Sequence, residues 1–555
     1  MPLPQPVTTP PADSKSPAAS PGGPTPAAPK PSPEAQSPLA PLRSPVFRML
    51  WATWMVANTC MWMNDVAAAW LMTSLTTSPV MVALVQSAST LPVFLLGLPS
   101  GAFADILDRR RYFIVTQIWV AAVAVLLCVT ILTGVIGPKL LLALTFLNGI
   151  GLAMRWPVFS AIVPELVPRH QLAAAMGLNG VAMNASRIIG PLVAGMLIAG
   201  AGTAWVFVLN AVLSATLAIV ITRWKREHVV SPLGRERLGS AIRVGMQFVV
   251  QSPRMRAVLI RMASFFLHST ALLAMLPLVA RALPGGDAGT FTALLASMGI
   301  GAIFGILVVQ PRMRRRLGRD EIVMGGTVLT SMATAGVAFA PNIYLAVPCM
   351  MLGGGAWLCA ANSLTTSAQF ALPDWVRARG MAICQMAIMG ATAVGAALWG
   401  QVADIANLHI GLSIAAASGI VVMAGVQRFL PDRSLIEDLT PSRAFKVPVV
   451  QITPEAGRIQ VTIEYCIDPA RAEEFRLVMQ ESRRSRLRQG ALEWHLQRDV
   501  VDPRLYYEQV TDESWTEHLR RFDRVTASDV ALRDRKLAFH VGDSPPAITR
   551  RIVER

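Results

Sequence analysis

Long uncharged stretches alternate with short basic segments over most of this chain of 555 residues. Twelve apolar runs of about 20 residues follow one another between residues 47 and 426, and a run of that length spans the hydrocarbon core of a bilayer. Backbone polar groups in lipid must be satisfied within the structure, so runs this long are predicted to be helices. The pattern predicts an all-α membrane protein with twelve transmembrane helices.

The predicted helices form two sets of six, at residues 45–222 and 257–430, joined by a basic cytoplasmic linker at 223–256. The two sets resemble each other, because a basic loop after the second helix recurs after the eighth, and a proline-containing acidic loop after the fourth recurs after the tenth. Two parallel six-helix repeats are the architecture of one large class of secondary transporters. We therefore expect a midplane substrate cavity between the two halves.

Both ends of the chain are polar. Residues 1–44 are rich in Pro, Ala and Ser, which predicts a disordered cytoplasmic tail rather than a signal peptide. Residues 431–555 return to a soluble composition, and their order of strand-like and helical segments, βαββαβ, predicts a small C-terminal α+β ferredoxin-like domain. The strands are expected at 458–467, 492–499, 505–510 and near 537–541, and the helices at 469–489 and 514–522.

The formal charge of +16 does not indicate nucleic-acid binding, because most Lys and Arg lie in short segments between apolar runs or in the C-terminal part. Basic loops alternate with non-basic loops along the chain, as expected when the basic loops face the cytoplasm. Both termini are therefore predicted to be cytoplasmic, in the inner (plasma) membrane of a bacterium. The expected partners are a lipid bilayer and a small-molecule substrate, and no nucleic acid.

The sequence predicts no metal site, no cofactor and no enzyme. Its six cysteines form no Cys-x-x-Cys pair, so neither a disulfide framework nor a zinc site is indicated. It has no Gly-x-x-x-x-Gly-Lys-Ser/Thr loop, so ATP is not expected to drive it. Energy must then come from a gradient or from another subunit, and protons are the first candidate.

A short motif lies where the second predicted helix meets the cytoplasm. It combines Gly101, Asp105, Arg109 and Arg110, and it resembles the signature of the major facilitator superfamily. Gly101 permits close helix contact, and Asp105 can bridge to a basic group on a neighbouring helix. We expect these residues to form a conformational latch, with a solvated loop turn as the alternative.

In the fifth predicted helix, Gly190, Pro191 and Gly195 resemble the Gly-Pro-x-x-Gly-Gly element that is typical of exporters in this superfamily. Glycine and proline at these positions would bend the helix and allow tight packing against a neighbour. The element favours export, although generic packing of small residues gives the same pattern.

Three ionisable residues inside predicted helices are candidates for transport and coupling. Arg187, deep in the fifth helix, must face the bundle interior, and Asp65 in the first helix is its natural counter-ion. This pair would couple export to proton uptake, or it would be a permanent structural ion pair. His268 in the seventh helix would relay protons or be a hydrogen-bonded bystander. Arg155 and Arg261, nearer to helix ends, are expected to snorkel.

Flexible thioethers beside aromatic rings suit a cavity that accepts varied apolar ligands. Met61, Trp62 and Met63 lie deep in the first helix, and Asn184 lies in the fifth. These four residues are the candidate lining of the substrate cavity. For Asn184 the alternative is a hydrogen bond that joins two helices.

Residues 47–430 resemble a bacterial subfamily of transmembrane secretion effectors that includes the enterobactin exporter. The segments that carry the resemblance are Phe47–Trp51, Ala69–Leu71, Pro164–Pro168, Ala274–Leu278 and Pro373–Arg379. One departure is Met61, which stands where an acidic residue is common in that subfamily. The resemblance implies a secondary transporter that exports a siderophore or drug-like metabolite by alternating access, with proton antiport.

The C-terminal part resembles dimeric α/β-barrel domains related to antibiotic-biosynthesis monooxygenases. Within it Trp494 and His495 could be read as oxygenase residues, but a regulatory or dimerising module is favoured because no further catalytic residues converge on them. Three alternatives to an exporter stay open. They are an importer on the same fold, a membrane-anchored enzyme or regulatory protein that uses the C-terminal domain, and a sensor that no longer transports.

Overall fold

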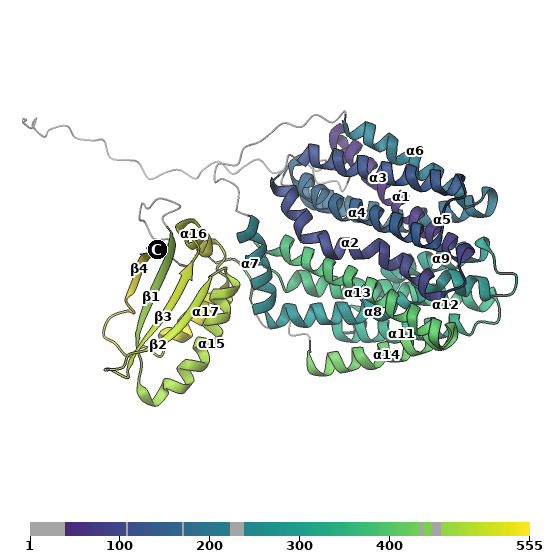
Figure 1. Ribbon diagram of the computed structural model, residues 1–555. Helices are drawn as coiled ribbons and strands as arrows, with labels where there is room; N and C mark the ends of the chain where they lie inside the picture. The colour runs from purple at the N-terminus through teal and green to yellow at the C-terminus, as the bar shows by residue number, and fades with distance from the viewer. Residues whose placement is uncertain are drawn as a thin grey trace, which may run out of the picture.

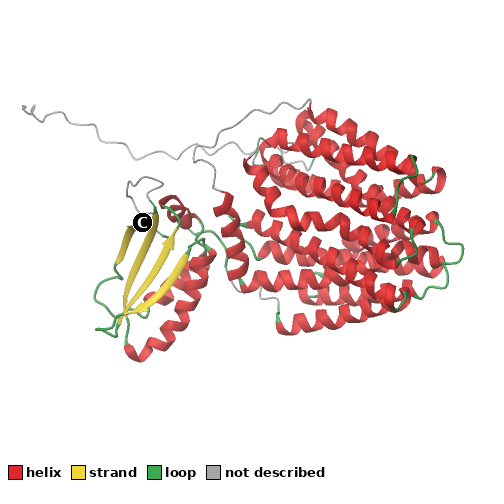
Figure 2. Ribbon diagram, viewed as in Figure 1, coloured by secondary structure: helices red, strands yellow, loops and turns green. Residues whose placement is uncertain are grey.

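A computed structural model of the chain describes residues 39–106, 109–168, 171–222, 238–373, 375–431, 438–442, 444–445 and 457–554. Figure 1 shows two parts, a bundle of long helices and a smaller domain beside one end of the bundle. Figure 2 shows that the strands lie in the smaller domain, whereas the bundle is helical. The predicted combination of an all-α membrane part and a small α+β domain is confirmed.

Six helices form the first half of the bundle. Ser44 caps the first of them, since its Oγ accepts a hydrogen bond from the Phe47 amide at 3.4 Å. Gly202 ends the fifth helix with a backbone φ of 97°, a value that residues other than glycine rarely adopt. The helices are α1 (Pro45–Leu75), α2 (Pro79–Ile106), α3 (Arg109–Leu132), α4 (Pro138–Leu166), α5 (Leu172–Ala201) and α6 (Thr203–Thr222).

Six more long helices form the second half, and one of them continues through a π-helical segment, Gly305–Val309, into a short additional helix. Asp287 begins this composite helix, because its Oδ1 accepts a hydrogen bond from the Thr290 amide at 2.8 Å. The helices are α8 (Pro253–Ala282), α9 (Ala288–Phe304) with α10 (Gln310–Met313), α11 (Arg319–Ala338), α12 (Ile343–Phe370), α13 (Arg377–Ile405) and α14 (Leu408–Phe429).

Ten helices of the described chain are long and apolar enough to cross a membrane. The other two long bundle helices, α1 and α4, have 31 and 29 residues and are not among the ten. Both carry an ionisable side chain far from their ends, Asp65 in α1 and Arg155 in α4. The predicted membrane bundle is confirmed, whereas its count of twelve spans is not exact by this criterion.

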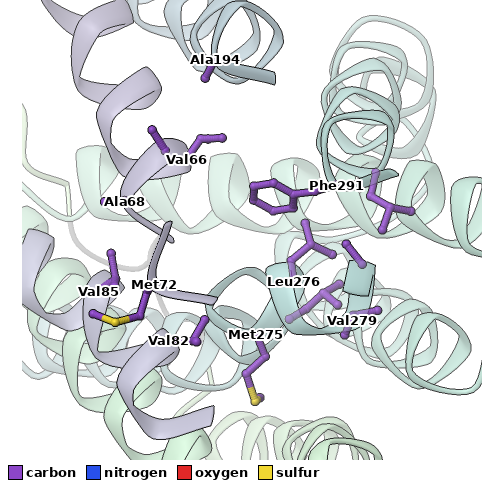
Figure 3. Close-up of a cluster of buried hydrophobic side chains, with 14 of the residues drawn as sticks. Val66, Ala68, Met72, Val82, Val85, Ala194, Met275, Leu276, Val279 and Phe291 are labelled. Atoms are coloured by element: carbon purple, nitrogen blue, oxygen red, sulfur yellow. The ribbon is translucent and has the colours of Figure 1, made fainter. Parts of the chain in front are cut away.

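The apolar core joins the halves on one side of the bundle and is divided on the other. We call the side where α1 begins and α14 ends the tail side, and the opposite side the far side. On the far side one cluster contains side chains from both halves, and Figure 3 shows Met72 of α1, Leu276 of α8 and Phe291 of α9 among its members. On the tail side each half has its own cluster in the described residues. Apolar packing therefore closes the far side.

The smaller domain is an antiparallel sheet with strand order β2-β3-β1-β4 and helices on one face (Figure 1). Alternate residues of β1, including Ile459 and Val461, are buried against Phe475 of α15. The order of elements is β1 (Arg458–Cys466), α15 (Ala472–Arg488), β2 (Glu493–Arg498), β3 (Leu505–Asp512), α16 (Trp515–Asp523), α17 (Ala527–Leu537) and β4 (Ile548–Val553). This topology matches the predicted βαββαβ order, with a second helix, α17, after α16.

The prediction of a last strand near residues 537–541 is wrong. There α17 extends to Leu537, and His540 beyond it makes an isolated bridge with Ile467. The last strand is β4, Ile548–Val553, which pairs with β1. All six side chains of β4 are exposed, so the alternation of buried and exposed residues that marks a strand in a sequence is missing there.

A buried carboxylate lies at the centre of the smaller domain. Glu508 of β3 is 0 % exposed, with Lys536 Nζ 3.1 Å from its Oε2 and Arg486 Nε 3.3 Å from its Oε1. Burial alone would raise the pKa of Glu508, but the two cations outweigh it and hold that pKa well below its usual range. Three further donors complete the network: Ser482 Oγ, the Tyr465 hydroxyl and Trp494 Nε1.

The smaller domain contacts the bundle through α7 (Leu238–Gln251), the helix before α8. Arg243 Nη2 lies 2.6 Å from Glu513 Oε2, and Arg243 Nη1 donates to the Gly490 carbonyl at 3.3 Å. In turn α7 packs on α2 of the first half and on α8 and α13 of the second. One helix therefore connects the domain to both halves (Figure 1).

Replacing Glu508 by Gln should strongly destabilise the smaller domain. Lys536 would stay buried and Arg486 half-buried without their counter-charge, which costs roughly 3–5 kcal/mol. Hydrogen exchange of the β1 and β3 amides in the full chain measures the loss. Glu481→Gln, at an exposed contact with Arg535, is the matched control and should cost less than about 1 kcal/mol.

The same substitution has a predicted pH dependence. Because the folded-state pKa of Glu508 lies below its unfolded value, its carboxylate stabilises the domain above about pH 5, and that contribution is lost as the pH falls toward the folded-state value. The difference in domain stability between wild type and Glu508→Gln should therefore become smaller at acidic pH. Equal exchange rates at pH 7 would contradict the prediction.

Exchanging the charges at the docking contact tests how the smaller domain is held. Arg243→Glu and Glu513→Arg alone should each loosen the contact, because like charges would face each other, and the double variant should recover most of it. Faster hydrogen exchange across α7 is the measurement. Arg476→Glu, at an exposed pair on α15, is the control. A double variant as loose as either single one would exclude this contact as the docking determinant.

Candidate functional site

Arg187 lies near the middle of α5 and is half-buried inside the bundle. Its guanidinium carbon lies 5.2 Å from the ring centre of Trp62 in α1 and 4.8 Å from that of Trp357 in α12. Both distances are within the range of attractive cation–π contacts. Among the described residues the guanidinium has no hydrogen bond or ion pair.

Trp357 brings the second half of the bundle to this cation. Its Nε1 donates to Ser269 Oγ of α8 at 3.1 Å, and its ring meets Phe266 edge-on at 5.8 Å. The indole is therefore held by α8 while its ring lies against Arg187 of α5. Arg187 thus contacts both six-helix sets near the middle of the bundle.

Asp65 lies three residues after Trp62 on α1, which places both on one helix face. It is half-buried, and its Oδ1 accepts a hydrogen bond from Ser89 Oγ of α2 at 3.0 Å. All other acidic residues of the bundle helices lie within the first or last three residues of their helix. The described ion pairs do not include Asp65 with Arg187, so the expected pair is not formed in this conformation.

His268 lies apart from these residues, between α8, α11 and α14 of the second half. Its Nδ1 is 2.7 Å from the Ser264 carbonyl oxygen, and it lines a cavity of about 10 Å³. The other polar residues of that cavity are Ser264, Ser269, Thr327, Thr330, Ser331 and Thr334. A space of this size holds about one water molecule, and nothing in the described chain joins it to Asp65.

The two arginines that were expected to snorkel do not. Arg155 and Arg261 are each 2 % exposed. Arg155 lies 5.4 Å from the ring centre of Trp54, whereas Arg261 forms a two-point ion pair with Asp320 at 2.6 and 3.1 Å. A partner within reach on a neighbouring helix is more favourable than a side chain extended toward the membrane surface, and the sequence does not reveal such partners.

Gly190 and Gly195 lie at two close helix contacts. A Cβ on Gly190 would come within 2.5 Å of Trp62 Cβ, and one on Gly195 within 2.4 Å of Thr292 Cβ in α9. Pro191, next to Gly190, is buried. Small residues here let α5 approach both α1 and the second half.

The other candidates fall in different places. Trp62 faces Arg187, whereas Met63 is 1 % exposed and belongs to the far-side core. Met61 is half-buried. The side chain of Asn184 lies outside the described residues.

The backbone of Gly101, Asp105 and Arg109, three of the four expected latch residues, is helical, and their side-chain surroundings lie outside the described part of the structure. Arg110 Nη2 donates to the Thr222 carbonyl at the end of α6, at 2.8 Å. A cation suits the carbonyl end of a helix.

Sequence reasoning missed Trp357, Ser269 and Ser89. A tryptophan near the middle of an apolar run was the available signal for Trp357, because indoles are more usual at membrane interfaces. The two serines gave no signal, since such residues are common in packed membrane helices.

Solved structures of membrane transporters share this two-half helical bundle. A bacterial homologue of the human lysosomal transporter Spinster matches with a TM-score of 0.55 and 14% identity, over 73% of this chain and 98% of that one. The sequence pattern of the transmembrane secretion effector family matches residues 36–555, so the chain belongs to that family.

Two relatives each match about two thirds of this chain. The staphyloferrin A transporter of Staphylococcus aureus is 24% identical over 65% of this chain and 90% of its own length. The multidrug efflux pump Tap of Mycolicibacterium fortuitum is 26% identical over 70% of this chain and 96% of its own length. The family agrees with the prediction of a multi-pass membrane transporter that is not an enzyme. A closer relation to the enterobactin exporter and a monooxygenase-like tail stay predictions.

Gly195→Ala should destabilise the bundle, because the new Cβ would overlap Thr292 at the contact between α5 and α9. Overpacking of this kind costs roughly 1–3 kcal/mol, measured as a lower midpoint of thermal unfolding in detergent. Gly200→Ala on the same helix is the matched control, since nothing lies within 4 Å of its added Cβ. Equal midpoints for the two variants would rule out a close contact at Gly195.

Proposed function

We propose that this chain is a secondary active transporter that exports a small organic molecule, of the siderophore or drug-like metabolite type, by proton antiport. It would work by alternating access between its two six-helix sets. The observation that carries this proposal is the contact of Arg187 with Trp357, which joins the halves near the middle of the bundle. A site between two moving halves is what alternating access requires.

The distribution of the apolar core supports the same mechanism. One cluster joins the halves on the far side, whereas separate clusters serve the two halves on the tail side. This suits a conformation closed on the far side. With both termini cytoplasmic, as the basic loops favour, the far side would face the outside of a bacterial plasma membrane.

The relatives support export over import. One of them is named a multidrug efflux pump and another a staphyloferrin A transporter, and the close contacts at Gly190 and Gly195 suit the packing expected of the exporter element. The alternative of an importer on the same fold has no comparable support.

Asp65 is the proposed proton-titrating group. Unlike the other acidic residues of the bundle helices, it lies far from the ends of its helix. It accepts a hydrogen bond from Ser89, and it has no counter-cation among the described ion pairs. Arg187 would act beside it rather than as its fixed partner. His268 is proposed only as a local participant within the second half.

The smaller domain is proposed as a regulatory or dimerising module. The sheet face opposite its helices has a hollow of about 400 Å³, lined by polar residues that include Glu464, Tyr507 and Arg551. A second copy of the chain could cover this face. The rival, an enzyme that the bundle only anchors, has less support, because Trp494 donates to the buried Glu508 and His495 is exposed.

Efflux of a panel of fluorescent dyes from cells that express the chain tests the proposal. A protonophore should abolish efflux, and Asp65→Asn should reduce it at least about tenfold, because the variant cannot exchange a proton. Asp404→Asn is the matched control, since Asp404 lies at the end of α13 and accepts from Ser78.

Two outcomes would count against parts of the proposal. Efflux that persists both in Asp65→Asn and in the presence of the protonophore would exclude proton antiport through Asp65. Loss of all activity on removal of residues 431–555, with the bundle still folded, would favour the anchored enzyme instead.

A further inference from the structure

The Arg187 guanidinium has five N–H donors and, among the described residues, no acceptor for any of them. Other inward arginines of the bundle differ. Arg261 donates two hydrogen bonds to Asp320, and Arg155 donates to the Ala57 carbonyl at 3.5 Å. Arg187 therefore has unused hydrogen-bonding capacity in the middle of the protein.

Its position is set by packing rather than by an ion pair. Gly190, one turn after Arg187, lets the backbone of α1 approach α5 so closely that a Cβ would lie 2.5 Å from Trp62 Cβ. In the second half, Ser269 of α8 accepts a hydrogen bond from Trp357 and so fixes the indole that contacts Arg187. The two indole faces attract the cation, but this attraction offsets only part of the cost of removing the guanidinium from water.

We propose that Arg187 is the anchor for a carboxylate on the transported molecule, and that Trp62 and Trp357 contact the apolar or aromatic body beside that carboxylate. A planar guanidinium matches a carboxylate through two parallel hydrogen bonds. The indole rings offer apolar surface on both sides of the interface between the halves. The inference rests on the proposed export function and names its substrate class as an organic acid.

The charge at this centre fits a single carboxylate better than a phosphate. Asp65 lies on the Trp62 face of α1 and would repel a second negative charge. Lys and a second Arg are absent from the contacts of Arg187 in the described residues. One cation without a second basic contact matches a monoanion better than a dianion.

Dansylglycine and dansylglycinamide test the anchor, because they differ only in the carboxylate. Their binding to the purified full-length chain at pH 7 is followed by energy transfer from tryptophan to dansyl. The acid should bind roughly 10- to 100-fold more tightly than the amide. Arg187→Gln should remove that preference, and Arg187→Lys, which keeps the charge but not the paired geometry, should keep part of it.

Arg281→Gln is the matched control. Arg281 also lies against an indole, 5.0 Å from the ring centre of Trp70, but it is exposed at the far end of α8. Its loss should leave the preference for the acid unchanged. Equal binding of acid and amide by wild type, no saturable binding of the acid, or a preference that survives in Arg187→Gln would each overturn the anchor.

The efflux experiment separates this inference from the export function. A chain that exports neutral dyes but binds acid and amide equally is an exporter without the carboxylate anchor. A chain that exports nothing, yet binds the acid in an Arg187-dependent way, has the anchor without the proposed function.

Discussion

A cation in the middle of an apolar bundle constrains the helices around it. Arg187 would cost several kcal/mol against lipid, so α5 must turn this face inward. The contacts with Trp62 and Trp357 then fix how α1 and α12 face α5. Gly190 allows the approach, because a larger residue would meet the backbone of α1. The central site and the helix packing are thus two consequences of one buried charge.

The halves meet along two seams, and small residues in both seams allow the helices to pack closely. Between α2 and α13, a Cβ on Gly97 would come within 2.8 Å of Met386, and one on Gly400 within 2.5 Å of Ala83. The second seam, between α5 and α9, has Gly195. Polar links across the first seam are few and directional, such as Ser87 Oγ to the Ala393 carbonyl at 2.7 Å. Surfaces of this kind can separate on one side of the membrane without leaving many unsatisfied groups.

Sequence reasoning recovered the depth of the important residues but not their direction around each helix. Hydropathy placed Arg187 and Asp65 deep in their spans, and the cost of charge in lipid placed Arg187 inward. Whether two such residues meet depends on rotations and tilts that packing sets. In the structure Asp65 therefore accepts a hydrogen bond from Ser89, whereas Arg187 contacts two indole rings.

The same limit explains the other differences. Arg261 finds Asp320 59 positions away, on a helix whose orientation the sequence does not specify. In the smaller domain β4 has no buried side chain, so its place in the sheet is fixed by backbone pairing with β1 rather than by a hydrophobic pattern. Features that produce an apolar pattern could be predicted from the sequence, whereas the choice of an interaction partner could not.

The contacts of α7 link the smaller domain to transport. A movement that separates α2 from α13 on the tail side must change the surface on which α7 packs. The domain holds α7 through Arg243, and Arg524 also lies 5.3 Å from the ring centre of Trp375, just before α13. Contacts that differ between two conformations shift the equilibrium toward the state in which they are stronger. If the halves separate on the tail side, as the proposed alternating access requires, docking of the domain and that opening would be energetically coupled through α7.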